Sequence, residues 1–216
     1  MKLAPLLKEE ITQYLPEYPV ILEAGAHIGR DTLKMIKLWP QAKIHAFEPV
    51  SNLYTLLVTN TRQYPSISTY PYALSNKSGA EPFYISSGAS SAVSSLFEPD
   101  QYIIDRPEVF FNQTTVTTLS LDDWARENKI DHVDFMWLDM QGAELKVLEA
   151  SKIVFPTVRV IVLEANLTQR FKSVPLLDEV SSFMRDKGFI IVLQDPPKHN
   201  KSNLLCVRKE FLKEML

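Results

Sequence analysis

The stretch Val20-Ile-Leu-Glu-Ala-Gly-Ala-His-Ile-Gly29 decides the fold that we expect for this chain. It opens with an apolar run typical of a buried strand and ends that run at the acid Glu23. Gly25 and Gly29 follow before a helical pattern begins. In an open α/β sheet, ligands bind beyond the carboxyl ends of the parallel strands, so this loop is a candidate binding site. The glycine spacing is G-x-x-x-G rather than the G-x-G-x-x-G that cradles a pyrophosphate, which disfavours a dinucleotide.

Composition excludes several classes of protein. The chain has 216 residues, 23 Lys+Arg against 26 Asp+Glu, and a net charge of −3, which argues against a strongly basic nucleic-acid binder. Its single cysteine, Cys206, cannot form an internal disulfide and has no partners for a cysteine-based zinc site. Only six glycines are present, against the roughly 15 of average usage, so two glycines in one short loop are informative.

Outward from this loop, buried-strand patterns alternate with amphipathic helical patterns. Such alternation predicts an α/β fold, with a mainly parallel sheet covered by helices on both faces and closed by an antiparallel C-terminal hairpin. The chain shows no internal repeat, and we expect one domain over residues 1–216. The expected strands are 20–24, 43–48, 67–74, 81–86, 116–119, 133–139, 158–164, 189–193 and 203–207, and the expected helices are 31–39, 52–62, 121–128, 143–150 and 176–187.

Residues 1–19 predict a helical extension that packs on the body. Leu3, Leu6, Leu7, Ile11 and Leu15 recur at helical spacing. Charged residues interrupt this apolar stripe, and no apolar run approaches the ~20 residues that span a bilayer. The segment therefore resembles neither a signal peptide nor an anchor, and we expect a cytoplasmic protein. A helix lying in a membrane interface is the alternative.

Residues 76–113 interrupt the alternation and are expected to be mostly irregular. The segment is rich in Gly, Ser, Pro and Asn, and a loop of this length in a compact domain is usually a lid or a binding segment. Its serine hydroxyls, with Tyr102, Arg106 and the pair Phe110-Phe111, suit a hydroxylated acceptor. The same aromatic side chains are also compatible with ordinary packing.

A second acid lies at the end of the next strand, in Ala46-Phe-Glu-Pro49. A carboxylate at that place can accept hydrogen bonds from both hydroxyls of a ribose. Glu48, together with Glu23 and the glycine loop, therefore predicts a site for a nucleoside without phosphates.

Five blocks then carry a family resemblance. They are Glu23-Ala-Gly-Ala-His-Ile-Gly29, Ala46-Phe-Glu-Pro49, Tyr72-Ala-Leu-Ser75, Leu119-Ser-Leu-Asp122 and Leu138-Asp-Met-Gln-Gly-Ala-Glu144. In order and spacing they resemble the signature of FkbM-type S-adenosylmethionine-dependent methyltransferases, over about residues 20–164. The resemblance implies a Rossmann-like class I methyltransferase fold with seven strands, and methyl transfer usually to an oxygen, often on a sugar. Four positions depart from the family pattern: Glu23 replaces an Asp, His27 an Asn, Met140 a Val and Gln141 a Glu.

We expect the cofactor S-adenosylmethionine to lie against the loop and the neighbouring strand ends. His27 is expected to form a hydrogen bond to the cofactor or to the backbone rather than to catalyse, and Thr32 to bind the methionine carboxylate. The expected cofactor-binding residues are Glu23, Gly25, Ala26, His27, Ile28, Gly29, Thr32, Glu48, Pro49, Ala73, Leu74 and Asp139.

Acids at later strand ends are the catalytic candidates. Methyl transfer requires an aligned acceptor oxygen and a group that removes its proton. Asp139 ends an apolar strand and is our candidate base, although it could instead cap the helix that follows. Glu144 is a second catalytic candidate, although an acid in a first helical turn also complements the helix dipole. Together with Glu164, these acids could also bind a divalent cation, which is a minor hypothesis.

Three functions remain open from the sequence. The first is an O-methyltransferase that acts on a saccharide or another small hydroxylated acceptor. The second is an NAD(P)-dependent oxidoreductase, which the glycine spacing disfavours. The third is a catalytically inactive fold that binds the cofactor and serves as an interaction module. The net charge makes a nucleic-acid acceptor less favoured.

Overall fold

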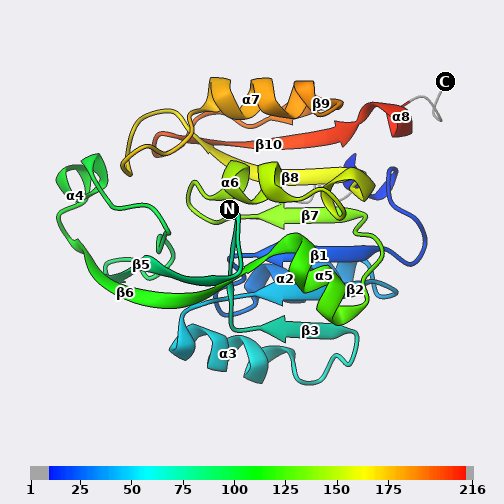
Figure 1. Cartoon of the computed structure of the whole chain (residues 1–216), viewed down its shortest axis with the longest axis horizontal. Helices are drawn as coiled ribbons and strands as arrows, with labels where there is room; N and C mark the ends of the chain where they lie inside the picture. The colour runs from blue at the N-terminus through cyan, green and yellow to red at the C-terminus, as the bar shows by residue number, and fades with distance from the viewer. Residues whose placement is uncertain (1–9, 213–216) are drawn as a thin grey trace.

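The computed structural model describes residues 10–212. In that part of the chain, seven strands form one sheet in the order β3-β2-β1-β7-β8-β10-β9 (Figure 1). The neighbouring strands β3, β2, β1, β7 and β8 pair in parallel. In contrast, β10 is antiparallel to both β8 and β9. This arrangement confirms the predicted parallel sheet with a C-terminal antiparallel hairpin. The strand bounds are β1 Val20–Ala24, β2 Lys43–Phe47, β3 Ile67–Tyr70, β7 Phe135–Leu138, β8 Val160–Asn166, β9 Phe189–Gln194 and β10 Lys201–Arg208.

Helices cover both faces of this sheet because each central strand is apolar on both sides. Successive side chains of a strand point to opposite faces. Met136 and Leu138 of β7 therefore enter the core under α5, α6 and α7, whereas Phe135 and Trp137 enter the core under α2. The helices are α2 Arg30–Leu38, α3 Ser51–Thr61, α4 Gln101–Asp105, α5 Leu121–Asn128, α6 Glu144–Ala150, α7 Leu177–Asp186 and α8 Lys209–Leu212, with a short 3-10 helix at Phe155–Thr157.

The third expected strand, 67–74, is wrong as a single element. It divides at Pro71-Tyr72, because proline cannot donate a ladder hydrogen bond. Its first half is β3 of the main sheet. Its second half is β4 (Ala73–Ser75), which pairs in parallel with β6 in a separate sheet.

The expected strand 81–86 is part of β5, but the rest of the segment 76–113 is more regular than we expected. Within the described residues, a second sheet has the order β4-β6-β5, and it contains the long hairpin of β5 (Gly79–Gly88) and β6 (Val109–Ser120). β6 is rich in threonine and half exposed, so its hydrophobic signal is weak although its β-propensity is high. In Figure 1 the hairpin and α4 lie beyond the arrowheads of β3 and β7, at the carboxyl edge of the main sheet.

The predicted N-terminal extension lies mostly outside the described residues, including Leu3, Leu6 and Leu7. Ile11 is buried and Leu15 packs beside it in the core under α2. Nowhere in residues 10–212 does a helix have the length and hydropathy needed to cross a bilayer.

Candidate functional site

A cavity of about 810 Å³ opens at the carboxyl edge of the parallel strands. This volume is within the usual range for small-molecule and cofactor sites. The loop after β1 and the ends of β2, β7 and β8 form its floor, and the segment between β5 and α4 lies across from them. The sheet edge that the sequence singled out therefore has a site of suitable size.

The loop after β1 is held close to the end of β7. Gly25 has φ +83°, and a side chain there would collide with the backbone carbonyl of Asp139. Gly29 also has positive φ, but a side chain there would lie 2.9 Å from Leu57 of α3. Gly29 therefore permits close packing of α3 rather than the close approach of a ligand that we expected. Ile28 likewise packs with an apolar cluster that contains Val50.

The amides of this loop are already bonded within the protein. The N–H groups of Gly25 and Ala26 donate to the carbonyl of Phe47 at 3.1 and 2.9 Å, and the His27 N–H donates to Glu48 at 2.9 Å. Ala26 and His27 nevertheless line the cavity. At these three positions, the side chains around the cavity rather than the amides are thus the groups available to a ligand.

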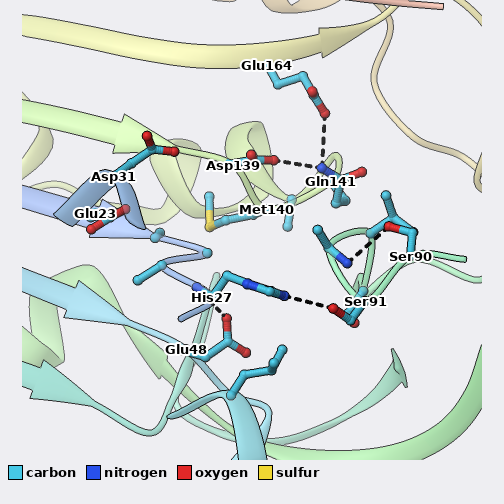
Figure 2. A pocket seen from close by; sticks show the side chains of 18 of the residues that line it. Glu23, His27, Asp31, Glu48, Ser90, Ser91, Asp139, Met140, Gln141 and Glu164 are labelled. Carbon is cyan, nitrogen blue, oxygen red and sulfur yellow. Dashed lines mark hydrogen bonds between the residues drawn. The ribbon is translucent and has the colours of Figure 1, made fainter. Parts of the chain in front are cut away.

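Glu48 is buried at the end of β2 with its carboxylate turned toward the cavity (Figure 2). One carboxylate oxygen accepts from the Val50 N–H at 2.8 Å and the other from the His27 N–H. Each carboxylate oxygen has a second lone-pair site, so two further donors can bind. Burial raises the pKa of Glu48 to about 7, although both amide bonds oppose this rise. Pro49, Ala73 and Leu74 also line the cavity, as expected.

The Thr32 hydroxyl does not point to a ligand, in contrast to our expectation. Thr32 is fully buried and donates its hydroxyl to Glu23 at the end of β1. Burial raises the pKa of Glu23 to about 8, and the nearby carboxylates of Asp31, Asp139 and Glu48 add to the rise. Glu23 lines the cavity, so Thr32 acts by holding this acid in place.

A polar network joins the ends of β7 and β8 (Figure 2). The Gln141 side-chain amide donates to Asp139 at 2.7 Å and to Glu164 at 3.1 Å. Lys201 of β10 forms an ion pair with Glu164 at 2.6 Å and also donates to the side-chain carbonyl oxygen of Gln141. Gln141 has φ +55°, a conformation that costs energy for a residue other than glycine and is often found at functional sites. The network thus places Asp139 at the cavity and holds its carboxylate.

Glu144 is the first residue of α6 and bonds back to the turn after β7. Its carboxylate accepts the Met140 N–H at 2.8 Å, and burial raises its pKa to about 8. This bond closes the turn that carries Asp139. The structure therefore gives Glu144 a positioning contact, in place of the contact with reacting atoms that we expected.

The three acids considered as cation ligands do not form a ligand set. Within residues 10–212, no group of three or more His, Cys, Asp or Glu side chains is arranged to hold a metal ion. Gln141 lies between Asp139 and Glu164, and the Lys201 ammonium already neutralises Glu164.

The segment between β5 and α4 is tied to the site at two points. Ser91 lies 3.0 Å from Nε2 of His27, a contact visible in Figure 2. Ser95 is buried and donates its hydroxyl to the backbone carbonyl of Gln141 at 3.0 Å. His27 thus has a side-chain partner in this segment, where we expected the cofactor or the backbone.

Sequence reasoning did not identify Lys201 or Arg170 as site residues, and it considered Ser95 only as one of the serines of segment 76–113. Lys201 reaches the site because β10 pairs antiparallel to β8, which brings residues some forty positions apart together. Ser95 and Arg170 lie in connecting segments without a recognisable motif. Only the departure of Gln141 from the family pattern could have drawn attention to this network.

Comparisons with known proteins agree with this geometry. A family model described as the methyltransferase FkbM domain matches residues 23–191. The 2-O-methyltransferase NoeI of Sinorhizobium fredii is 29% identical over 152 residues, which cover 68% of this chain and 63% of NoeI. The chain thus spans less than two thirds of the length of NoeI. The hexuronic acid methyltransferase AglP of Haloferax volcanii is 23% identical over 186 residues, which cover 81% of this chain and 70% of AglP.

Among solved structures, the fibrillarin of Aeropyrum pernix with natively bound S-adenosyl-L-methionine is similar, with a TM-score of 0.53 and 15% identity. The match covers 94% of this chain and 72% of that one. This likeness concerns the fold and agrees with the predicted Rossmann-like class I methyltransferase architecture. Because the FkbM domain model covers most of its length and the sheet has the expected strand order, the chain belongs to the FkbM family of S-adenosylmethionine-dependent methyltransferases.

Proposed function

We propose that this protein transfers a methyl group from S-adenosylmethionine to a hydroxyl of a saccharide or another small hydroxylated acceptor. The observation that carries the proposal is one cavity with Glu48 on the β2 side and the Asp139 network on the β7 and β8 side. Two relatives support the proposal: NoeI is a 2-O-methyltransferase, which supports transfer to an oxygen, and AglP is a hexuronic acid methyltransferase, which supports a sugar acceptor.

The residues at the nucleoside side fit the cofactor. Glu48 would accept the ribose hydroxyls, Glu23 would face the methionine ammonium, and Ala73 and Leu74 would contact the adenine. Glu23 and Glu48 are both buried acids with raised pKa values, so donors and a cation would stabilise their ionised forms. When bound, S-adenosylmethionine supplies an electrophilic methyl group on a positively charged sulfur.

Asp139 would act on the acceptor at the other side. Its carboxylate would take the proton that the acceptor hydroxyl loses when that oxygen is methylated. Gln141 would hold that carboxylate in line, and Glu144 would hold the turn through the Met140 amide. A base held in this way contributes about 10²- to 10⁴-fold to a rate.

We further infer that residues 1–216 act as one domain, with 76–113 as a lid over the acceptor. The contacts of Ser91 with His27 and of Ser95 with Gln141 support closure of this segment over the cavity. A cytoplasmic location stays a prediction from the sequence.

Methyl transfer can be tested with labelled S-adenosylmethionine and a panel of hexosides, deoxyhexosides and hexuronides. We expect a labelled methyl ether on a sugar hydroxyl and an equal amount of S-adenosylhomocysteine. Binding of S-adenosylhomocysteine without transfer to any acceptor would favour the inactive interaction module. Tight binding of NAD in place of S-adenosylhomocysteine would favour the oxidoreductase.

The role of Asp139 predicts a specific kinetic result. Asp139→Asn should lower kcat by about 10²- to 10⁴-fold, because the amide keeps the bond from Gln141 but cannot take the proton. Calorimetry should show that the affinity for S-adenosylhomocysteine falls far less than kcat, although Asp139 is also an expected cofactor-binding residue. The exposed Asp186→Asn on α7 is the control and should keep wild-type kcat. Equal kcat values for the two variants would exclude Asp139 as the base.

A further inference from the structure

Arg170 lines the cavity and is buried, which is unusual for a charged side chain. It lies in the segment after β8 and is only 4% exposed. Its guanidinium stacks on the ring of Tyr102 in α4 at 3.9 Å, and one terminal nitrogen donates to the His199 carbonyl at 3.0 Å. Its Nε is buried and has no hydrogen-bond partner. One N–H donor of a permanently charged group is therefore left unused.

No acid of the described chain balances this charge. Among residues 10–212, no Asp or Glu oxygen lies within 4.0 Å of the Arg170 guanidinium in an ion pair. The nearby acids that line the cavity or border it have other partners. Glu164 pairs with Lys201, Asp195 accepts from Ser202 and Asn203, and Glu108 pairs with Arg106.

An unpaired buried charge is costly, and arginine cannot relieve that cost by losing its proton. Stacking on Tyr102 and the bond to His199 fix the orientation of the guanidinium without neutralising it. A planar fork held in this way is suited to a carboxylate, sulfate or phosphate group. The buried guanidinium without an ion-pair partner therefore indicates that an anionic group of a ligand pairs with Arg170.

The position of Arg170 favours the acceptor rather than the nucleoside as the source of this anion. Glu48 follows β2 and Arg170 follows β8, and the order β2-β1-β7-β8 places three strand spacings between those strands. Because neighbouring strands are about 4.8 Å apart, the ends of β2 and β8 are about 14 Å apart. Tyr102, which stacks on Arg170, belongs to α4, and His199, which accepts from it, belongs to the β9–β10 turn, which lies beyond β8 in the strand order.

We propose that Arg170 is a specificity residue that binds an acidic group on the acceptor, so that the preferred acceptor is an acidic sugar. This inference rests on the proposed methyl transfer to a sugar hydroxyl and adds the charge of the acceptor. The acidic group is a carboxylate or a sulfate or phosphate ester. Arg30, Lys34, Arg106, Lys198 and Lys201 also line the cavity, but among the described residues Arg170 is the only lysine or arginine that is buried, which makes it the main anchor.

The test is a titration of the protein loaded with S-adenosylhomocysteine, read by the ¹⁵N signal of the Arg170 Nε–H. The signal is assigned by its loss in Arg170→Met. The probes are methyl glucuronoside, glucose 6-sulfate, glucose 6-phosphate and the neutral methyl glucoside, each at millimolar concentration. We expect at least one acidic probe to shift the signal and the neutral glucoside to leave it unchanged. Which acidic probe binds best distinguishes a carboxylate from an ester.

Calorimetry with variants completes the test. Arg170→Met should weaken the best acidic probe by roughly 10- to 100-fold and leave S-adenosylhomocysteine binding unchanged. Arg170→Lys should recover part of the loss, because it keeps the charge without the fork. The exposed Arg185→Met on α7 is the matched control and should bind like the wild type.

Two results would overturn the inference. The first is that no acidic probe shifts the Arg170 signal of the wild-type protein, a readout that does not depend on how well the variants fold. The second is that Arg170→Met weakens S-adenosylhomocysteine as much as the sugar, which would assign the guanidinium to the cofactor. Anion binding without methyl transfer to any acceptor would instead refute the proposed function and keep this subsite.

Discussion

Glu48 and Glu144 are both buried acids with raised pKa values, yet their surroundings give them different tasks. Glu48 lines the cavity and keeps lone pairs free for a ligand beyond its two amide bonds. Glu144 accepts the Met140 N–H and closes a turn. At the scale of single residues, the direction in which a carboxylate points decides between binding and support.

The raised pKa of Glu48 predicts pH-dependent binding of S-adenosylhomocysteine. With a pKa of about 7, Glu48 is mostly protonated at pH 6 and mostly ionised at pH 8. Ribose hydroxyls donate to the ionised form, so affinity should rise as pH rises through 7, and binding should release protons. Glu48→Gln should weaken binding by about 10-fold or more at pH 8 and remove the part of this dependence centred near pH 7, whereas the part due to Glu23, with a pKa of about 8, should remain.

Calorimetry between pH 6 and pH 8.5, in buffers of different ionisation enthalpy, measures both the affinity and the released protons. Glu17→Gln, an exposed acid outside the site, is the control and should follow the wild-type curve. A wild-type affinity that is independent of pH would contradict the assigned role of Glu48.

At the scale of elements, the loop between β1 and α2 is shaped by the strands beside it. Its first turn contacts the Asp139 carbonyl at the end of β7, and its amides bond to the end of β2. The three strand ends are therefore coupled through backbone contacts. A change in this loop should disturb the site and the sheet edge together.

Two glycines with the same backbone angle offer a test of this coupling. Gly25 and Gly188 have φ +83° and +82°, but only Gly25 has backbone atoms where a side chain would lie. Gly188→Ala should cost only the conformational strain, about 1 kcal/mol. Gly25→Ala should cost about 1–3 kcal/mol more, because the Asp139 carbonyl must move. Urea unfolding measures both values, and similar losses would argue against the close packing of this loop.

At the scale of the whole molecule, the site lies where separate parts of the chain meet. Two apolar cores hold the sheet and its helices, and the β5–β6 hairpin with α4 extends over the sheet edge (Figure 1). A separate apolar cluster joins the lid to the segment after β8, and it contains Tyr102, Val109, Phe171 and Val174. A ligand in the cavity would contact both the sheet edge and the lid.

A ligand that bridges these parts should stabilise the folded protein. At a concentration of 100 times its Kd, S-adenosylhomocysteine should add about 2.7 kcal/mol to the free energy of unfolding. Thermal unfolding should therefore show a clear rise in Tm with S-adenosylhomocysteine. NAD at the same concentration should give no rise, and a larger shift with NAD would contradict the assigned cofactor.

The order of strands and helices was predictable because it depends on local patterns. Apolar runs ended by acids predicted β1 and β2. The expected helix 121–128 is α5 over its observed range, and the Ser120 hydroxyl caps it by accepting the Asp123 N–H at 3.1 Å. The expected strands 81–86 and 116–119 lie within β5 and β6, but the length of β6 and its pairing with β5 were not predicted, because a half-exposed strand rich in threonine has little hydrophobic contrast.

The sequence by itself determined the parallel sheet, its edge and the acids Glu23, Glu48 and Asp139 at that edge, because strand ends and glycine turns are encoded within a few residues. The tertiary structure alone decided that Thr32 and Glu144 support other groups, and that Gln141, Lys201 and Arg170 enter the site. Those contacts join residues that are distant in the chain. They depend on how separate elements pack, and a local pattern does not encode that packing.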